Sequence, residues 1–378
     1  MSIFTGGLGY IVPFLVVLTV LVFVHELGHY LVARWNGVRI EVFSIGFGPE
    51  IFGWNDKVGT RWKFSAIPLG GYVKMFGDAD PASRASPHDL AEMTPEERAG
   101  SFHHKRLMQR VAVVTAGPAA NFIFAIVALA LLFATVGQPY TPAEIGRVQP
   151  GSAAEAGGLQ PGDVIQSIDG KPIDRFEEVQ REVRLDDGTP MRLTLLRGTQ
   201  QLTVSVTPRV TAVTDRFGNQ HNFGLLGIER NGVDYVRRNP ADALWRAGME
   251  TLNLTTGTLT AVWQMIIGAR PADEIGGPLR IAQMSGEVAQ GGVVALIWFM
   301  AVLSVNLGLI NLFPVPILDG GHLLFYAAEA VRGKPLGQRA QEYGFRVGLA
   351  LVLTLMVFAT WNDLVHLRVI EFLKGLVT

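Results

Sequence analysis

The sequence predicts an α-helical polytopic membrane protein with about four transmembrane helices, a membrane-associated β region and an inserted β-rich soluble domain. Two properties of the composition support this fold class. Hydrophobic residues make up 49% of the 378 residues and charged residues only 17%, below the roughly 25% usual in soluble domains, and the mean hydropathy is +0.28. The third observation is a change of pattern near residue 145, from long apolar runs to short alternating strands separated by turns.

Composition also excludes several classes of protein and site. The net charge of −1 gives no electrostatic reason to propose a nucleic-acid partner. Cysteine is absent, so disulfides and thiolate ligands are excluded and any zinc must be held by His, Asp or Glu.

The first apolar stretch has no charged residue before Glu26. We place the first span at roughly Leu8 to Val32, ending near Arg34. A basic leader region and a small-residue cleavage site are both missing, so we interpret the stretch as a retained helix rather than a signal peptide.

A β-rich segment follows, from residue 39 to 75. Its aromatic and β-branched residues alternate with polar ones between Gly-Pro and Asn-Asp breaks, which is typical of short strands and hairpins. The part from Ser65 to Met75 is apolar for a loop, and we expect it to lie at or dip into the membrane surface.

The second span fits within Met108 to Val136 and contains the run Gly117-Pro118-Ala119-Ala120-Asn121. Small residues allow helices to approach closely within a membrane. A buried Asn needs a polar partner in lipid, so Asn121 should face protein.

Residues 145–209 read as a water-soluble domain, and a helix beginning at Asn239-Pro240 follows it. That helix is uncharged from 251 to 269, but its threonines and amphipathic spacing favour a non-spanning helix over a spanning one. The third span covers 288–318, interrupted by asparagines and prolines, and the fourth covers about 347–362.

These elements define seven predicted segments. They are a first transmembrane helix (1–36), a cytoplasmic-side β region and loop (37–107), a second transmembrane helix (108–138), a soluble domain (139–212), an extracytoplasmic linker with an amphipathic helix (213–287), a third transmembrane segment (288–340) and a fourth transmembrane helix with a tail (341–378).

Basic residues predict the orientation of these spans. Eleven Lys or Arg lie between residues 34 and 110 and four between 319 and 346, whereas none precedes Arg34. The positive-inside rule therefore puts both loops in the cytoplasm, and both termini and the soluble domain outside.

The chemistry centres on His25-Glu26-Leu27-Gly28-His29. Histidines four residues apart share one helix face, so both imidazoles can bind one metal ion, with Glu26 placed to take a proton from a metal-bound water. The alternative is that hydrogen bonds alone satisfy these side chains, which is costly for three polar groups at the end of a transmembrane helix.

A catalytic zinc site needs a third protein ligand. The candidates at membrane depth are Asp319, His322, Glu41 and Glu329. Asp319 is favoured because it ends the third uncharged run next to two glycines, on the same predicted side of the membrane as His29.

Three separated motifs resemble the site-2 protease family, specifically bacterial intramembrane metalloproteases of the regulator-of-sigma-E (RseP) type. They are the His25–His29 motif, the run ending at Asn121, and Asn311-Leu312-Phe313-Pro314-Val315-Pro316-Ile317-Leu318-Asp319-Gly320. The resemblance implies one Zn²⁺ per chain bound by His25, His29 and Asp319, with Glu26 as general base. It also implies that Asn311 assists in binding the substrate or the oxyanion.

Residues 145–210 likewise resemble a PDZ domain of bacterial proteases. Only one such unit is visible, whereas some close relatives of the family carry two, which puts in doubt any gating scheme that needs a pair. PDZ folds capture chain termini by β-augmentation, but a steric filter is equally compatible with these residues, and the ligand is unknown.

The resemblance implies cleavage of single-span membrane proteins such as anti-sigma factors, and of leftover signal peptides, in the bacterial inner membrane. We expect substrate contacts at Asn311, Asn121, Gly70, Gly71 and Tyr72. The last three belong to a strand that we expect to pair, as an added edge, with an unwound substrate helix. The alternative for that strand is a hairpin that only seals the cytoplasmic face. The rival function is a catalytically silent membrane PDZ scaffold; a zinc transporter is disfavoured because only one intramembrane metal cluster is visible.

Overall fold

Helices and strands of the computed structural model form two compact units, the first combining Met1–Leu131 with Ala241–Thr378 and the second comprising Leu132–Pro240. The structure describes residues 8–78, 92–185, 188–214, 220–230, 232, 234–268 and 276–366. Each unit has its own hydrophobic core.

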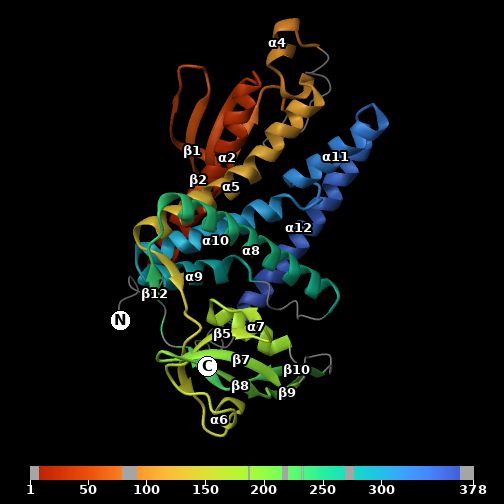
Figure 1. Cartoon of the computed structure of the whole chain (residues 1–378). Helices are drawn as coiled ribbons and strands as arrows, with labels where there is room; N and C mark the ends of the chain where they lie inside the picture. Colours follow the sequence, from red (N-terminus) through yellow and green to blue (C-terminus); the bar gives the residue numbers. More distant parts are fainter. Residues whose placement is uncertain are drawn as a thin grey trace, which may run out of the picture. The chain divides into compact units, whose positions relative to one another are not determined.

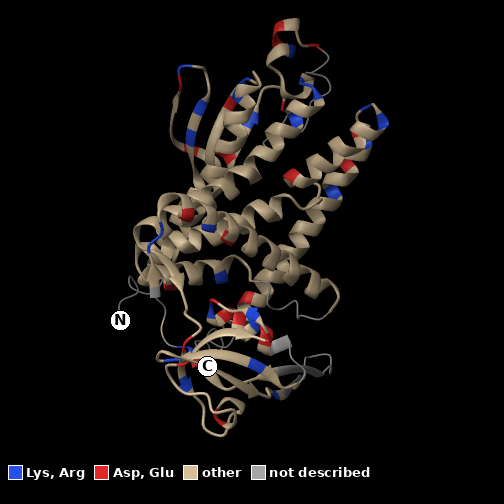
Figure 2. Cartoon of the chain, in the orientation of Figure 1, with Lys and Arg blue, Asp and Glu red and all other residues tan. Residues whose placement is uncertain are grey.

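Four helices of the first unit are long and apolar enough to cross a bilayer, within the residues described. They are α2 (Leu8–Trp35), α5 (Leu107–Thr135), α10 (Val293–Asn311) and α12 (Gln338–His366). About 20 apolar residues are needed to span the hydrocarbon core. Figure 2 shows α10 and most of α2 free of charged residues, which are coloured instead along the β1–β2 hairpin and around the α11–α12 connection. The predicted fold class is confirmed.

The third of these helices is shorter than the uncharged run of 288–318. A turn at Gly291 and Gly292, with φ of +88° at Gly292, separates α9 (Pro278–Gln290) from α10. At the other end α10 stops at Asn311, shortly before Pro314 and Pro316, neither of which has an N–H to continue the helix.

The predicted β region is a long antiparallel hairpin, β1 (Ile40–Asn55) and β2 (Arg61–Met75), which packs against α2 (Figure 1). β1 pairs with both ends of β2: Phe43 lies opposite Val73 on one side and opposite Trp62 on the other. The strand at 71–75 is therefore an edge of this sheet. Phe43 is fully buried and stacks on Trp62 within the hairpin, and its edge-on contact with Tyr30 of α2 anchors the hairpin to that helix.

Helices that are shorter or less apolar complete the first unit: α4 (Pro95–Gly100), the 3₁₀ turn η1 (Phe102–His104), α8 (Pro240–Ile266), α9 and α11 (Asp319–Arg332). α8 is not among the four helices apolar enough to span a membrane. It buries small side chains, and its Thr258 hydroxyl donates to the side-chain carbonyl of Asn306 on α10.

The second unit is β-rich, as predicted for the inserted domain. Its four-stranded sheet has the order β6-β5-β7-β8, and the alternate residues Met191, Leu193 and Leu195 of β7 are buried in its core. Ile228 on β11 pairs with Val148 on β4, so this compact unit continues past residue 212. The strands and helices are β3 (Gln138–Tyr140), β4 (Ile145–Val148), α6 (Ala153–Ala156), β5 (Val164–Ile168), β6 (Lys171–Pro172), α7 (Phe176–Leu185), β7 (Met191–Arg197), β8 (Gln200–Val206), β9 (Arg209–Thr214), β10 (Gln220–Leu225), β11 (Ile228–Arg230) and β12 (Asp234–Val236).

Candidate metal centre

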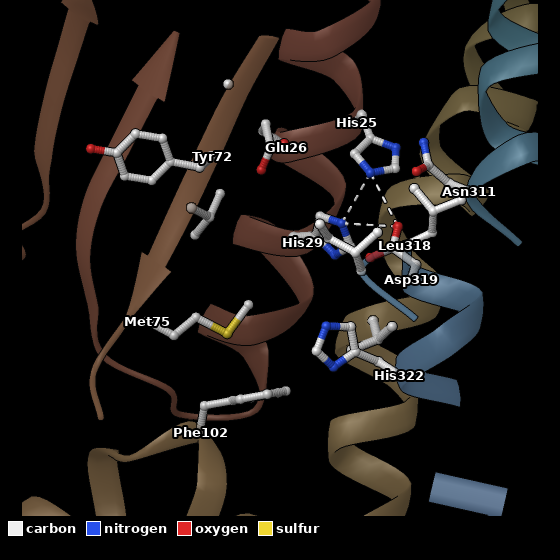
Figure 3. Close-up of a pocket in the computed structure, with 14 residues that line it drawn as sticks. His25, Glu26, His29, Tyr72, Met75, Phe102, Asn311, Leu318, Asp319 and His322 are labelled. Atoms are coloured by element: carbon white, nitrogen blue, oxygen red, sulfur yellow. Dashed lines mark hydrogen bonds and ion pairs between the residues drawn. The ribbon is translucent and has the colours of Figure 1, made fainter. Parts of the chain in front are cut away.

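Two imidazoles and one carboxylate converge at the helical unit's centre. His25 and His29 share a face of α2, and their Nε2 atoms lie 3.2 Å apart. Asp319, the first residue of α11, approaches them with Oδ2 at 3.2 Å from Nε2 of His25 and 3.5 Å from Nε2 of His29. Figure 3 shows the three side chains pointing toward one another.

The geometry of this group suits a small divalent cation. Ligands of a tetrahedral zinc ion at roughly 2.0–2.1 Å stand about 3.3 Å apart, and the three observed separations of 3.2, 3.2 and 3.5 Å match that spacing. Oδ2 of Asp319 is buried without a hydrogen-bond partner, so this acceptor still needs a cationic or donor group. Among the described residues, these three form the group whose ligand atoms are close enough to hold one ion.

A tight turn between α10 and α11 brings Asp319 to α2. A Cβ added at Gly320 would lie 2.2 Å from the carbonyl oxygen of Phe313, and one at Gly321 would lie 2.4 Å from that of Val315. Ile317 has φ of +97°, a conformation that strains a β-branched residue. Such strain typically costs about 1–3 kcal/mol and persists where the surrounding structure enforces it.

Helix α5 supports both histidines from behind. Nδ1 of His29 lies 2.9 Å from the backbone oxygen of Val113, and Nδ1 of His25 lies 3.1 Å from Nδ2 of Asn121. Gly117 makes room between them, because a Cβ there would lie 2.2 Å from Nε2 of His29. A hydrogen bond to a backbone carbonyl leaves no mark on residue type, so the contact with Val113 could not be predicted from the sequence.

Asn121, which we expect to contact the substrate, lies outside the cavity in this structure. Its side chain is fully buried behind His25 and does not line the cavity beside His25, His29 and Asp319. It faces protein, as expected, and its neighbour is the imidazole of His25.

A cavity of about 210 Å³ opens beside the three ligands. Glu26, Gly71, Tyr72 and Asn311 line it, whereas Gly70 lies outside it against the ring of Phe47. Figure 3 shows Tyr72 on the strand side of this cavity and Asn311 on the side of α10.

Glu26 lies between the ligands and the hairpin. Gly71 and Val73 of the edge strand line the same cavity as Glu26. Gly71 allows the strand to approach, because a Cβ there would lie 2.8 Å from Cγ1 of Val22 and 3.3 Å from Cγ of Glu26. The edge strand of the hairpin therefore lies against the side chain that follows His25.

The other third-ligand candidates have different partners. Glu41 pairs with Lys74 at 2.8 Å, and Glu329 pairs with Arg110 at 2.5 Å. His322 lines the cavity and packs against another ring, that of Phe345, without joining the ligand group.

Comparisons with known proteins identify the family of this chain. The model of peptidase family M50 matches residues 13–355. A protein of Agrobacterium fabrum named "Putative zinc metalloprotease Atu1380" is 49% identical over 95% of this chain and 97% of its own length. "Metalloprotease MmpA" of Caulobacter vibrioides is 39% identical over 99% of this chain and its whole length.

Among solved structures, the PDZ domain of an SdrC-like protein from Listeria innocua is 22% identical, with a TM-score of 0.20, over 25% of this chain and 98% of its own length. The family match and the relatives, by contrast, extend over almost the whole chain. The chain therefore belongs to peptidase family M50 and is a multi-pass membrane enzyme of the zinc metalloprotease class.

Proposed function

We propose that this chain is an intramembrane endopeptidase that binds one Zn²⁺ through His25, His29 and Asp319 and cleaves peptide bonds within transmembrane segments. The observation that carries the proposal is the convergence of three ligand atoms within 3.5 Å of one another, beside a cavity that contains Glu26. Two of the ligands belong to α2, an apolar helix long enough to cross a bilayer.

A bound zinc would polarise the scissile carbonyl and acidify a water molecule. Glu26 would take a proton from the attacking water and return it to the leaving amine, the role of a general base that then acts as an acid. The edge strand packs against the Glu26 side chain, since a Cβ at Gly71 would lie 3.3 Å from its Cγ. Asn311 is proposed to bind the substrate carbonyl, because its side chain lines the same cavity.

A substrate helix must unwind before cleavage, since its carbonyls are otherwise held in its own hydrogen-bond ladder. The strand at 71–75 pairs with β1 along one edge, and Gly71, Tyr72 and Val73 line the cavity. We propose that the unwound segment docks beside this strand by β-augmentation, with Gly70 bending the strand through its φ of +120°.

The substrates we propose are single-span membrane proteins such as anti-sigma factors, together with leftover signal peptides. Release of such a factor would make the reaction a step of regulated intramembrane proteolysis. The cavity lies next to apolar helices rather than in the β-rich unit, which favours a substrate that arrives through the membrane.

The Glu26→Gln variant tests this function. We expect zinc content to remain at one per chain and cleavage to fall by roughly 10²–10⁴-fold, the usual contribution of a general acid–base group. Membrane proteomics of cells carrying Glu26→Gln should reveal single-span fragments that do not accumulate with the wild-type enzyme. Glu41→Gln is the matched control, because Glu41 pairs with Lys74 outside the cavity. Near-wild-type cleavage by Glu26→Gln would refute the mechanism and favour a scaffold.

We further propose that the protein resides in the bacterial inner membrane, with both termini and the β-rich unit outside and the metal centre toward the cytoplasm. The natural chain has no cysteine, so single cysteines introduced at Val58 and Gln160 report orientation directly. Both positions are exposed. A membrane-impermeant maleimide applied from outside should label Gln160→Cys and spare Val58→Cys; the reverse pattern would invert the topology.

A further inference from the structure

Asn121 is a buried polar group beside the proposed ligand His25 that the function above leaves unused. It lies on α5 with no exposed surface, and its Nδ2 is 3.1 Å from Nδ1 of His25. Its Oδ1 is buried without a hydrogen-bond partner. A buried amide with an unsatisfied oxygen beside an imidazole needs an explanation.

The tautomer of His25 supplies that explanation. Nε2 of His25 faces both Nε2 of His29 and Oδ2 of Asp319, so a metal held by these groups must bind Nε2. That nitrogen must then be unprotonated, which puts the proton of the neutral ring on Nδ1. An Nδ1–H requires an acceptor, and the group opposite it is the amide of Asn121.

We propose that the side-chain oxygen of Asn121 accepts the Nδ1–H of His25 and thereby fixes the ring tautomer that binds the metal. A half-turn of the amide exchanges Oδ1 and Nδ2 and brings the unpartnered oxygen to Nδ1. With Nδ2 facing Nδ1, as the structure shows, the ring proton belongs on Nε2, where it competes with the metal. Asn121 is therefore a positioning residue for His25, not a catalytic one.

The second histidine shows the same design. Nδ1 of His29 lies 2.9 Å from the backbone oxygen of Val113, which can only accept. Val113 and Asn121 lie on one helix, eight residues apart, and meet the two histidines of α2 in reverse order, as antiparallel helices require. α5 thus provides one acceptor for each imidazole, the arrangement that orients metal-binding histidines and raises their basicity.

This inference rests on His25 being a zinc ligand, and the experiment separates the two claims. The zinc dissociation constant is measured by chelator competition on the purified full-length chain. His25→Ala must weaken zinc binding; if it does not, the ligand set of the proposed function fails, whatever Asn121 does.

Two substitutions of Asn121 then decide the role of its oxygen. Asn121→Leu fills a similar volume without an acceptor and should weaken zinc binding about 10–100-fold, the usual effect of losing such a partner. Asn121→Asp offers only acceptors and should keep the dissociation constant within about threefold of wild type. The visible spectrum of the Co²⁺-loaded protein should change with Leu and be preserved with Asp, because it reports how His25 is oriented toward the metal.

Ser304→Ala is the matched control. The Ser304 hydroxyl donates to the backbone oxygen of Asn121 at 2.9 Å, so this change disturbs packing around Asn121 without touching its amide. Zinc affinity should stay unchanged. A folded Asn121→Leu protein with wild-type affinity would overturn the proposal, as would a folded Asn121→Asp protein that has lost tenfold or more. If the Leu variant does not fold, the Asp variant alone decides between acceptor and donor.

Discussion

Two carboxylates, one in each unit of the molecule, have opposite surroundings. In the β-rich unit, Asp163 is fully buried, and both of its oxygens accept from the guanidinium of Arg197 at 2.7 and 2.8 Å. The backbone N–H of Gln160 adds a third bond. In the helical unit, Asp319 faces two imidazoles, and its Oδ2 has no hydrogen-bond partner.

The difference distinguishes a buried carboxylate that stabilises the fold from one that is available to bind a metal ion. Burying a carboxylate is tolerated when its acceptors are all satisfied, and Asp163 meets that condition within the protein. Asp319 would meet it with an additional cationic or donor group. Satisfied acceptors therefore indicate a role in folding, and an unsatisfied acceptor beside metal-binding side chains indicates a ligand.

Removing Asp319 should have the largest effect. We expect Asp319→Ala to lower zinc affinity by more than the roughly 10–100-fold that loss of a supporting partner costs, and to abolish detectable cleavage. Zinc content after dialysis of the full-length protein is the measurement. Unchanged metal content would move the third ligand elsewhere, and His322→Ala would be the next variant to examine.

Adding a methyl group at Gly117, where α5 packs against His29 of α2, should have the next largest effect. A Cβ at position 117 would lie 2.2 Å from Nε2 of His29, so Gly117→Ala must displace the imidazole or separate α5 from α2. Overpacking of this kind costs about 1–3 kcal/mol, and we expect zinc affinity and thermal stability to fall together. Gly257→Ala is the control, since nothing lies within 4 Å of that Cβ. Equal behaviour of the two variants would argue against a tight α2–α5 contact.

Breaking the satisfied pair should affect only the β-rich unit. Asp163→Ala leaves Arg197 without its carboxylate. We expect the free energy of unfolding of the unit to fall by about 1–3 kcal/mol, less than for a fully buried ion pair because the guanidinium is one-third exposed. Hydrogen exchange of the whole protein should show faster exchange in β5 and β7, while zinc content remains unchanged. A loss of zinc in this variant would show that the two units are energetically coupled.

Lowering the pH should weaken the same ion pair and have a smaller effect on the stability of the β-rich unit. Burial alone would raise the pKa of Asp163, but the bonds from Arg197 and Gln160 outweigh it and lower the pKa below its usual value. A lowered folded-state pKa gives stability that is complete above the unfolded-state value near about 3.9 and is lost as pH falls toward the folded one. Hydrogen-exchange protection of β5 should therefore hold from pH 8 to 5 and decline below about pH 4. In Asp163→Asn this acid dependence should be weaker; an unchanged profile would exclude Asp163 as its source.

Local patterns accounted for much of the fold. Uncharged runs predicted the four apolar helices because hydropathy is summed along the chain, and alternation predicted the hairpin and the β-rich unit. The extent of the third helix was harder to predict, since Gly291 and Gly292 interrupt an otherwise uniform run. The boundaries of the seven predicted segments remain predictions, because composition changes gradually where one segment passes into the next.

The sequence by itself determined the spacing of His25 and His29 on one helix face and the position of Glu26 beside them, because these residues are close in the chain. It also determined membership of the peptidase family, because short sequence motifs carry that resemblance. The tertiary structure decided which distant carboxylate reaches the histidines and that Asn121 contacts His25 instead of lining the cavity. Those contacts join residues 96 to 294 positions apart. They depend on how helices pack and how a strained turn is closed, and neither is written in the local pattern of side chains.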